Sequence, residues 1–153
     1  MMTLENISSI TGRTENSCSC DECKSMCKKC PCLGTPEDML RLIEAGHIDK
    51  LVPTLWASGI PWGIPPLHLV APRIKGNDLF KGPCVFLNDN DLCDLHDVGL
   101  KPTEGKLVTH KPQVVGDPNK VLAFVVARTW LDPERAETIQ RVFTLMVDHL
   151  KNK

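Results

Sequence analysis

The residues of this sequence with the clearest chemical potential are its cysteines, which crowd near the N-terminus. Six of the eight fall within fifteen residues. Thiolate sulfur binds zinc at about 2.3 Å, and two cysteines separated by two residues in a tight turn can both reach one ion. Two such C-x-x-C pairs, separated by a three-residue gap, lie inside this run, which therefore has the spacing of metal ligands. The six are Cys18, Cys20, Cys23, Cys27, Cys30 and Cys32.

The two remaining cysteines, Cys84 and Cys93, lie far along the chain on either side of a turn signal. Two apolar runs flank residues 88–91, whose Asn and Asp side chains tolerate the backbone conformations that turns need. This pattern predicts a β-hairpin with one cysteine on each arm, close enough to share one ion. We therefore predict a metal site that joins the Cys-rich segment to this hairpin. Its ligands would come from Cys20, Cys23, Cys27, Cys30, Cys32, Cys84 and Cys93.

The identity and number of the ions stay open at the level of sequence. One tetrahedral zinc ion uses four ligands, so eight thiols suggest either two ions or a cluster with spare cysteines. We predict zinc, with an iron–sulfur cluster as the alternative, because both take thiolates and spacing does not separate them. Cys18 and Cys32 bracket the two pairs and could be substitute ligands, members of a second site or bystanders, and His96 could complete a site through its neutral imidazole. Disulfides and a thiol-based redox protein are the remaining alternatives.

The bulk composition indicates one soluble globular domain. The chain has 153 residues, of which 42% are hydrophobic and 24% charged, values typical of such proteins. Its net charge of −1 offers no basic surface for nucleic acid, and no polybasic cluster or apolar run of about 18 residues points to a membrane. Because the N-terminus has no apolar segment that would act as a secretory signal, we expect a cytoplasmic location, where disulfides are rare.

The elements predicted to position the cysteines begin with a helix just after Cys32. Thr35 is placed to cap it, Pro36 suits its first position and Gly46 ends it. Its apolar face would consist of Met39, Leu40 and Ile43. Further on, short apolar pieces predict strands at residues 51–52 and 67–70, and three prolines predict a loop at residues 58–66.

The C-terminal part is predicted to be helical. Pro118 follows Asp117 at the start of a segment whose core, residues 121–127, is apolar all round. That pattern favours a buried helix, with a buried strand as the alternative. Asp132 and Pro133 then begin a last helix whose apolar residues recur every three or four positions. This predicted face comprises Ala136, Ile139, Val142, Phe143, Met146, Val147 and Leu150.

Together these elements predict a small single α+β domain at residues 18–153. Its N-terminal half would be loop-rich, bound to metal and include the β-hairpin, while its C-terminal half supplies a helical core. Residues 1–17 are polar and lack apolar periodicity, so we expect a flexible arm there. Outside the cysteines, Glu104 follows a proline in an irregular stretch and is a candidate for a positioned carboxylate. No nucleophile elbow, Walker loop or dinucleotide fingerprint is present, so the question of an enzymatic activity stays open.

The arrangement of these motifs resembles the CxxCxxCC cysteine-cluster family of zinc- or iron-chelating domains. The resemblance covers residues 18–106 and combines the N-terminal cluster, a helix start in Thr-Pro-Glu-Asp and the hairpin sequences Pro-Cys-x-Phe-Leu and Cys-x-x-His. The resemblance implies that the cysteines of these motifs bind metal. The residues that carry it are Cys20, Cys23, Cys27, Cys30, Cys32, Thr35, Pro36, Glu37, Asp38, Pro83, Cys84, Phe86, Leu87, Cys93 and His96.

Two features depart from the pattern of that family. Pro31 separates two cysteines that are usually adjacent, and residues 100–106 lack a further cysteine. The last ligand would then be missing or come from Cys32, Cys18 or His96. We predict a metal-binding protein whose ion is mainly structural, because the available thiolates saturate its coordination. The alternatives are an iron–sulfur protein that transfers electrons or supports S-adenosylmethionine chemistry, and a small interaction subunit of a larger assembly.

Overall fold

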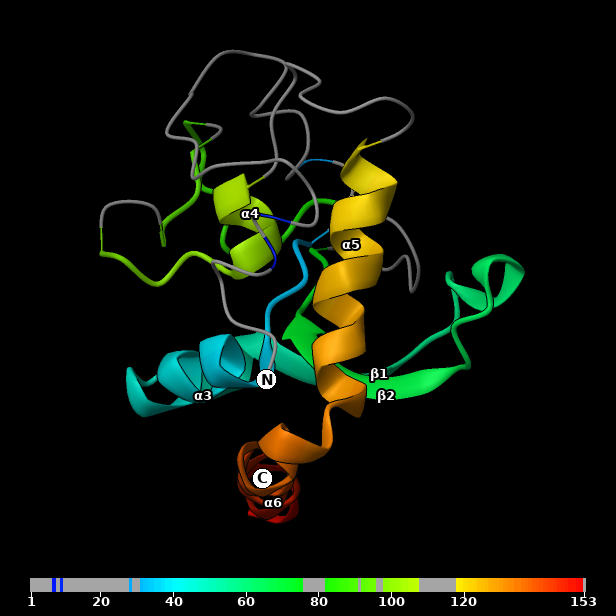
Figure 1. Ribbon diagram of the computed structural model, residues 1–153. Helices are drawn as coiled ribbons and strands as arrows, with labels where there is room; N and C mark the ends of the chain where they lie inside the picture. Colours follow the sequence, from blue (N-terminus) through cyan, green and yellow to red (C-terminus); the bar gives the residue numbers. More distant parts are fainter. Residues whose placement is uncertain are drawn as a thin grey trace.

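Figure 1 shows the protein as a computed structural model. It describes residues 31–75, 82–90, 92–95, 98–107 and 118–152, together with Ile7, Ser9 and Lys28. This part of the chain has an α+β fold, as predicted, in which a two-stranded antiparallel sheet packs with helices, the last of them the longest. Within the same residues, no helix has the length and apolar character needed to cross a membrane.

Helix α3 (Pro36–Glu44) forms where the capping pattern predicts it. The Thr35 hydroxyl accepts a hydrogen bond from the Asp38 N–H at 3.2 Å, and the Asp38 carboxylate accepts one from the Thr35 N–H at 2.9 Å. This reciprocal pair is a capping box, which satisfies backbone donors that the first turn leaves open. Gly46 follows the last turn with φ of 92°, a conformation that glycine adopts without strain. The inward residues are Met39 and Leu42, with Leu40 and Ile43 partly buried.

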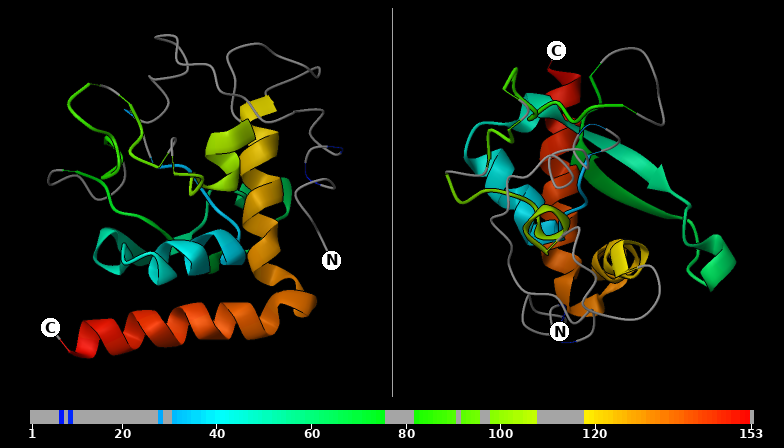
Figure 2. Two further views of the ribbon diagram at one scale, coloured as in Figure 1. Left: turned by 90° about the vertical axis from the view of Figure 1, so that its left-hand side faces the viewer. Right: turned by 90° about the horizontal axis from the view of Figure 1, so that it is seen from above.

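Strands β1 (Leu51–Trp56) and β2 (Leu67–Pro72) pair antiparallel over all six residues of each strand. Both are longer than the predicted apolar pieces, because backbone pairing continues through Pro53 and Thr54 to Trp56 on β1 and through Ala71 to Pro72 on β2. The segment between them is a loop with one 3-10 turn at Ile60–Trp62, as its prolines predict. The loop end of the β1–β2 pair projects away from the helices (Figures 1 and 2).

The remaining described helices are α4 (Thr103–Leu107), α5 (Pro118–Arg128) and α6 (Ala136–Lys151). Residues 121–127 lie within α5, so the predicted helix is confirmed and the alternative of a strand is wrong. Asp132 starts the turn that leads into α6, because its Oδ1 accepts the Glu134 N–H at 3.0 Å. Figure 2 shows α6 alongside α3, with α5 rising from the start of α6 and α4 next to α5.

Two clusters of buried side chains form the interior. The main cluster lies between α3, the sheet and α6, and includes Met39, Leu51, Leu69, Phe86 and Met146. The smaller cluster joins α4 to α5 and consists of Ile7, Leu107, Leu122, Val125 and Val126. Ile7 is 0% exposed, so this one residue of the N-terminal stretch contacts the packed helices. Apart from Ile7 and Ser9, the arm predicted at residues 1–17 lies outside the described residues.

The predicted apolar face of α6 is wrong at both ends, where Ala136, Val147 and Leu150 are exposed. Val142 and Met146 are fully buried, whereas Val147 is 45% and Leu150 is 43% exposed. Successive residues are rotated by about 100° around a helix, so Val147 points away from the line that Val142 and Met146 define. Leu150 continues that line but lies near the end of the sixteen-residue helix, and its partner α3 has nine residues.

Candidate metal centre

Three of the predicted metal ligands, Cys32, Cys84 and Cys93, line one small pocket. Cys84 is 6% exposed and the other two are half-buried. The volume of the pocket is about 10 Å³, close to the minimum that holds one water-sized particle. The fold therefore places cysteines from both predicted segments around a space suited to a single small occupant. The remaining walls are Pro72, Phe86, Leu95, Lys101 and Pro102.

Main-chain pairing positions Cys84 and Cys93. Cys93 pairs with Leu87 and Cys84 pairs with Ile74, each in an isolated antiparallel bridge. The Asn88 Oδ1 accepts backbone N–H groups of residues 90 and 92 at 2.9 and 3.1 Å, which closes the turn between the two arms. The predicted hairpin is present, but its two cysteines are not opposite each other. Cys84 instead pairs with Ile74, which lies two positions after the end of β2.

Cys32 is positioned by hydrogen bonds of the two residues that follow it. The Leu33 N–H donates to Glu104 Oε1 at 2.8 Å, and the Glu104 N–H donates to Leu33 O at 3.0 Å. The Trp130 Nε1–H donates to Gly34 O at 2.8 Å. Because these bonds join the segment to α4 and to the turn after α5, the helical half of the protein holds the main chain next to Cys32.

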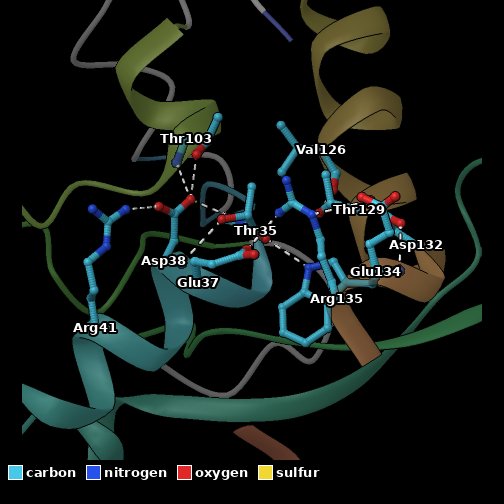
Figure 3. Close-up of polar contacts among 12 residues, drawn as sticks. Thr35, Glu37, Asp38, Arg41, Thr103, Val126, Thr129, Asp132, Glu134 and Arg135 are labelled. Atoms are coloured by element: carbon cyan, nitrogen blue, oxygen red, sulfur yellow. Dashed lines mark hydrogen bonds and ion pairs between the residues drawn. The ribbon is translucent and has the colours of Figure 1, made fainter. Parts of the chain in front are cut away.

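Asp38 links α3 to α4 (Figure 3). Its side chain is 2% exposed, and its Oδ2 accepts the N–H groups of Thr35 and Thr103, both at 2.9 Å, and the Thr103 hydroxyl. Its Oδ1 accepts a bond from the half-exposed guanidinium of Arg41. A buried carboxylate bound by this many donors has little freedom to move. The start of α4, and the two pocket-lining residues just before it, are therefore fixed relative to α3.

Arg135 makes a second polar link to α3, at the start of α6 (Figure 3). Its side chain is 4% exposed, its Nη1 donates to Glu37 Oε2 at 2.6 Å, and its Nε lies 3.5 Å from Asp132 Oδ2. A nearly buried guanidinium is stabilised by such paired carboxylates, which replace the water it loses. The first turn of α3 thus contacts both α4 and α6 through charged side chains.

The three pocket cysteines do not by themselves form a complete metal site. Among the described residues, no group of three or more His, Cys, Asp or Glu side chains is arranged to hold an ion. Ligation would therefore need the sulfur atoms to move closer together, further ligands from elsewhere, or both. Lys101 also lines the pocket, and a lysine charge close to thiolates favours their ionised form.

The other sequence predictions have different outcomes. Glu104 is a positioned carboxylate, as predicted, since its side chain accepts a hydrogen bond from the backbone next to Cys32. The contact of Asp38 with Thr103 and that of Trp130 with the main chain were missed. The Thr-x-x-Asp pattern identifies Asp38 as a capping residue, but nothing in the sequence signals its distant partner. Outside the described residues lie Cys18, Cys20, Cys23, Cys27, Cys30 and His96.

No protein-family model, curated protein or solved structure matches this chain. The resemblance to the cysteine-cluster family therefore stays a prediction, carried by the residues named above.

Proposed function

We propose that this chain is a metal-binding protein in which cysteine thiolates hold a structural zinc ion between the Cys-rich segment and the hairpin that carries Cys84 and Cys93. The observation that supports this most directly is the pocket that Cys32, Cys84 and Cys93 line together. These residues come from distant parts of the sequence, and thiolates that surround a space for one small particle are the ligand set that zinc favours. The proposed location is the reducing cytoplasm, where such thiols persist.

The fourth ligand would come from the cysteines that precede Cys32 in the sequence. Cys30 lies two residues before Cys32, and two residues of extended chain span about 7 Å. With four thiolates the coordination shell is full, which leaves no open position for a water or a substrate. The ion would therefore stabilise the fold instead of acting in catalysis. Structural zinc contributes about 10–16 kcal/mol in small peptides near neutral pH, enough to organise a loop-rich half-domain.

Elemental analysis of the native protein, purified without oxygen, tests this proposal. We expect about one or two zinc ions per chain and a colourless protein. Iron together with visible absorbance would instead indicate an iron–sulfur cluster, and with it the alternative of electron transfer or S-adenosylmethionine chemistry. A protein that contains neither metal, and that binds no zinc when its thiols are reduced, would contradict the proposal.

Serine replacements test which cysteines belong to the site. Cys84→Ser and Cys93→Ser should each lower the zinc content and the melting temperature, because a hydroxyl is a poor substitute for a thiolate ligand. Leu92→Ser is the matched control, since Leu92 lies beside Cys93 and is 42% exposed. It should keep the zinc content of the unmodified protein. If both cysteine variants also keep the full zinc content, the hairpin that carries Cys84 and Cys93 is not part of the site.

A second candidate function, that of a small interaction subunit, is favoured by the projecting β1–β2 hairpin (Figure 2). Leu55 on β1 is 58% exposed and Ile60 in the loop is 52% exposed. Exposed apolar side chains on a projecting element are typical of protein contact sites. Co-purification of a protein that is lost in a Leu55→Ser, Ile60→Ser variant supports this role, and a monomer with no partner counts against it.

A further inference from the structure

Helix α4 contacts the segment that carries Cys32 through Glu104. The carboxylate Oε1 of Glu104 accepts the Leu33 N–H at 2.8 Å, and the Glu104 N–H donates to Leu33 O at 3.0 Å. The pair joins residues 71 positions apart and is partly buried, so water competes with it less than at the surface. Rotation of the backbone at Leu33 would strain or break both bonds. The pair therefore holds the peptide unit that follows Cys32.

Gly105 brings the same helix against the sulfur of Cys32. A Cβ at this position would lie 3.3 Å from Cys32 Sγ and 3.2 Å from two carbons of the Lys101 side chain. Those distances are shorter than ordinary van der Waals contacts, so a larger residue would have to displace one of these neighbours. Because Cys32 and Lys101 both line the pocket, α4 forms the support behind that wall.

The position of α4 is itself fixed by its ends. A helix of five residues does not persist by its own hydrogen bonds. Thr103, its first residue, binds the buried carboxylate of Asp38 through its N–H and its hydroxyl. Leu107, its last residue, is 1% exposed in the smaller core cluster. Glu104 thus extends from an anchored helix to the backbone next to Cys32.

We infer that Glu104 is a positioning residue of the metal site, which sets where the Cys32 sulfur lies relative to Cys84 and Cys93. This inference rests on the proposed zinc-binding function. Glu104 acts through the backbone of Leu33 and needs no contact with the ion. Outer-shell groups that orient metal ligands in this way typically change metal affinity by about 10- to 100-fold when they are removed.

Two variants at this position and one control test the role. Glu104→Ala removes the acceptor, whereas Glu104→Gln keeps an amide oxygen that accepts the same N–H. Glu137→Ala, at an exposed position on α6, removes the same charge elsewhere. Zinc affinity is measured by competition with a chelator. The zinc-free, reduced proteins are then treated with iodoacetamide, and mass spectrometry gives the alkylation rate of Cys32 relative to that of Cys84.

We expect Glu104→Ala to weaken zinc binding by about 10- to 100-fold and to raise the relative alkylation of Cys32. Glu104→Gln should stay within about threefold of the unmodified protein, and Glu137→Ala should match it. An alanine variant with unchanged affinity and an unchanged alkylation ratio overturns the inference. So does a glutamine variant as weak as alanine, or an equal rise in alkylation at both cysteines, which would indicate general loosening of the fold.

The design separates this inference from the proposed function. If the unmodified protein binds no zinc, the proposed function fails, and the alkylation ratio alone decides whether Glu104 positions Cys32. If Glu104→Ala does not fold, Gly105→Ala takes its place, because the added methyl group presses on the Cys32 sulfur while alanine favours the helix. Zinc affinity that falls by about tenfold or more in that variant supports the role of α4, and unchanged affinity overturns it.

Discussion

Asp38 is the buried charge on which the link between α3 and α4 depends, and its replacement by alanine should be among the most damaging single changes. Asp38→Ala leaves the N–H groups of Thr35 and Thr103 without an acceptor in a place where the original side chain is 2% exposed. Each buried donor left unsatisfied costs about 1–3 kcal/mol. For the two backbone donors together, we therefore expect the free energy of unfolding to fall by about 2–6 kcal/mol.

Two further variants separate the charge from the hydrogen bonds. In Asp38→Asn, the amide oxygen can still accept the Thr35 and Thr103 donors while the NH₂ group faces Arg41. The Arg41 side chain is 52% exposed and can turn toward water, so the expected loss is about 1–2 kcal/mol. Arg41→Ala removes the exposed partner alone and should cost less than about 1 kcal/mol.

Urea unfolding followed by far-ultraviolet circular dichroism measures all three variants. The loss should be largest for Asp38→Ala, smaller for Asp38→Asn and smallest for Arg41→Ala. An Asp38→Ala protein within about 1 kcal/mol of the unmodified protein would refute it, because the carboxylate would then not be the acceptor that joins the two helices. Asp38→Ala should also weaken zinc binding, since α4 loses the bonds that anchor its first turn.

Two other outcomes follow from the contacts of the helical half. Removal of the metal with a chelator should red-shift the fluorescence of Trp130, because its indole N–H binds the main chain two residues after Cys32. A background with Trp56→Phe and Trp62→Phe isolates this signal, and an unchanged spectrum would show that metal removal leaves the segment in place. Met146→Ala should cost about 2–5 kcal/mol in thermal or urea unfolding, whereas Val147→Ser should cost less than about 0.5 kcal/mol. Similar losses for the two would mean that Val147 faces the core after all.

The local features of this protein could be predicted from its sequence because their signals and their contacts lie within a few residues. The capping box of α3 joins Thr35 to Asp38, three positions apart, and Pro118 and Asp132 begin their elements for equally local reasons. Turn residues around Asn88 predicted the hairpin in the same way. Such patterns depend on backbone geometry that short segments carry with them.

The arrangement of the candidate site was decided by tertiary structure. The bonds that hold the pocket join Asp38 to Thr103, Leu33 to Glu104 and Gly34 to Trp130, at separations of 65, 71 and 96 positions. Nothing in the spacing of the cysteines indicates that α4 supports Cys32 or that Cys84 pairs with Ile74, beyond the end of β2. The exposure of Val147 likewise depends on which side of α6 meets α3. Partners that far apart are chosen by packing of the whole chain, which sequence periodicity does not encode.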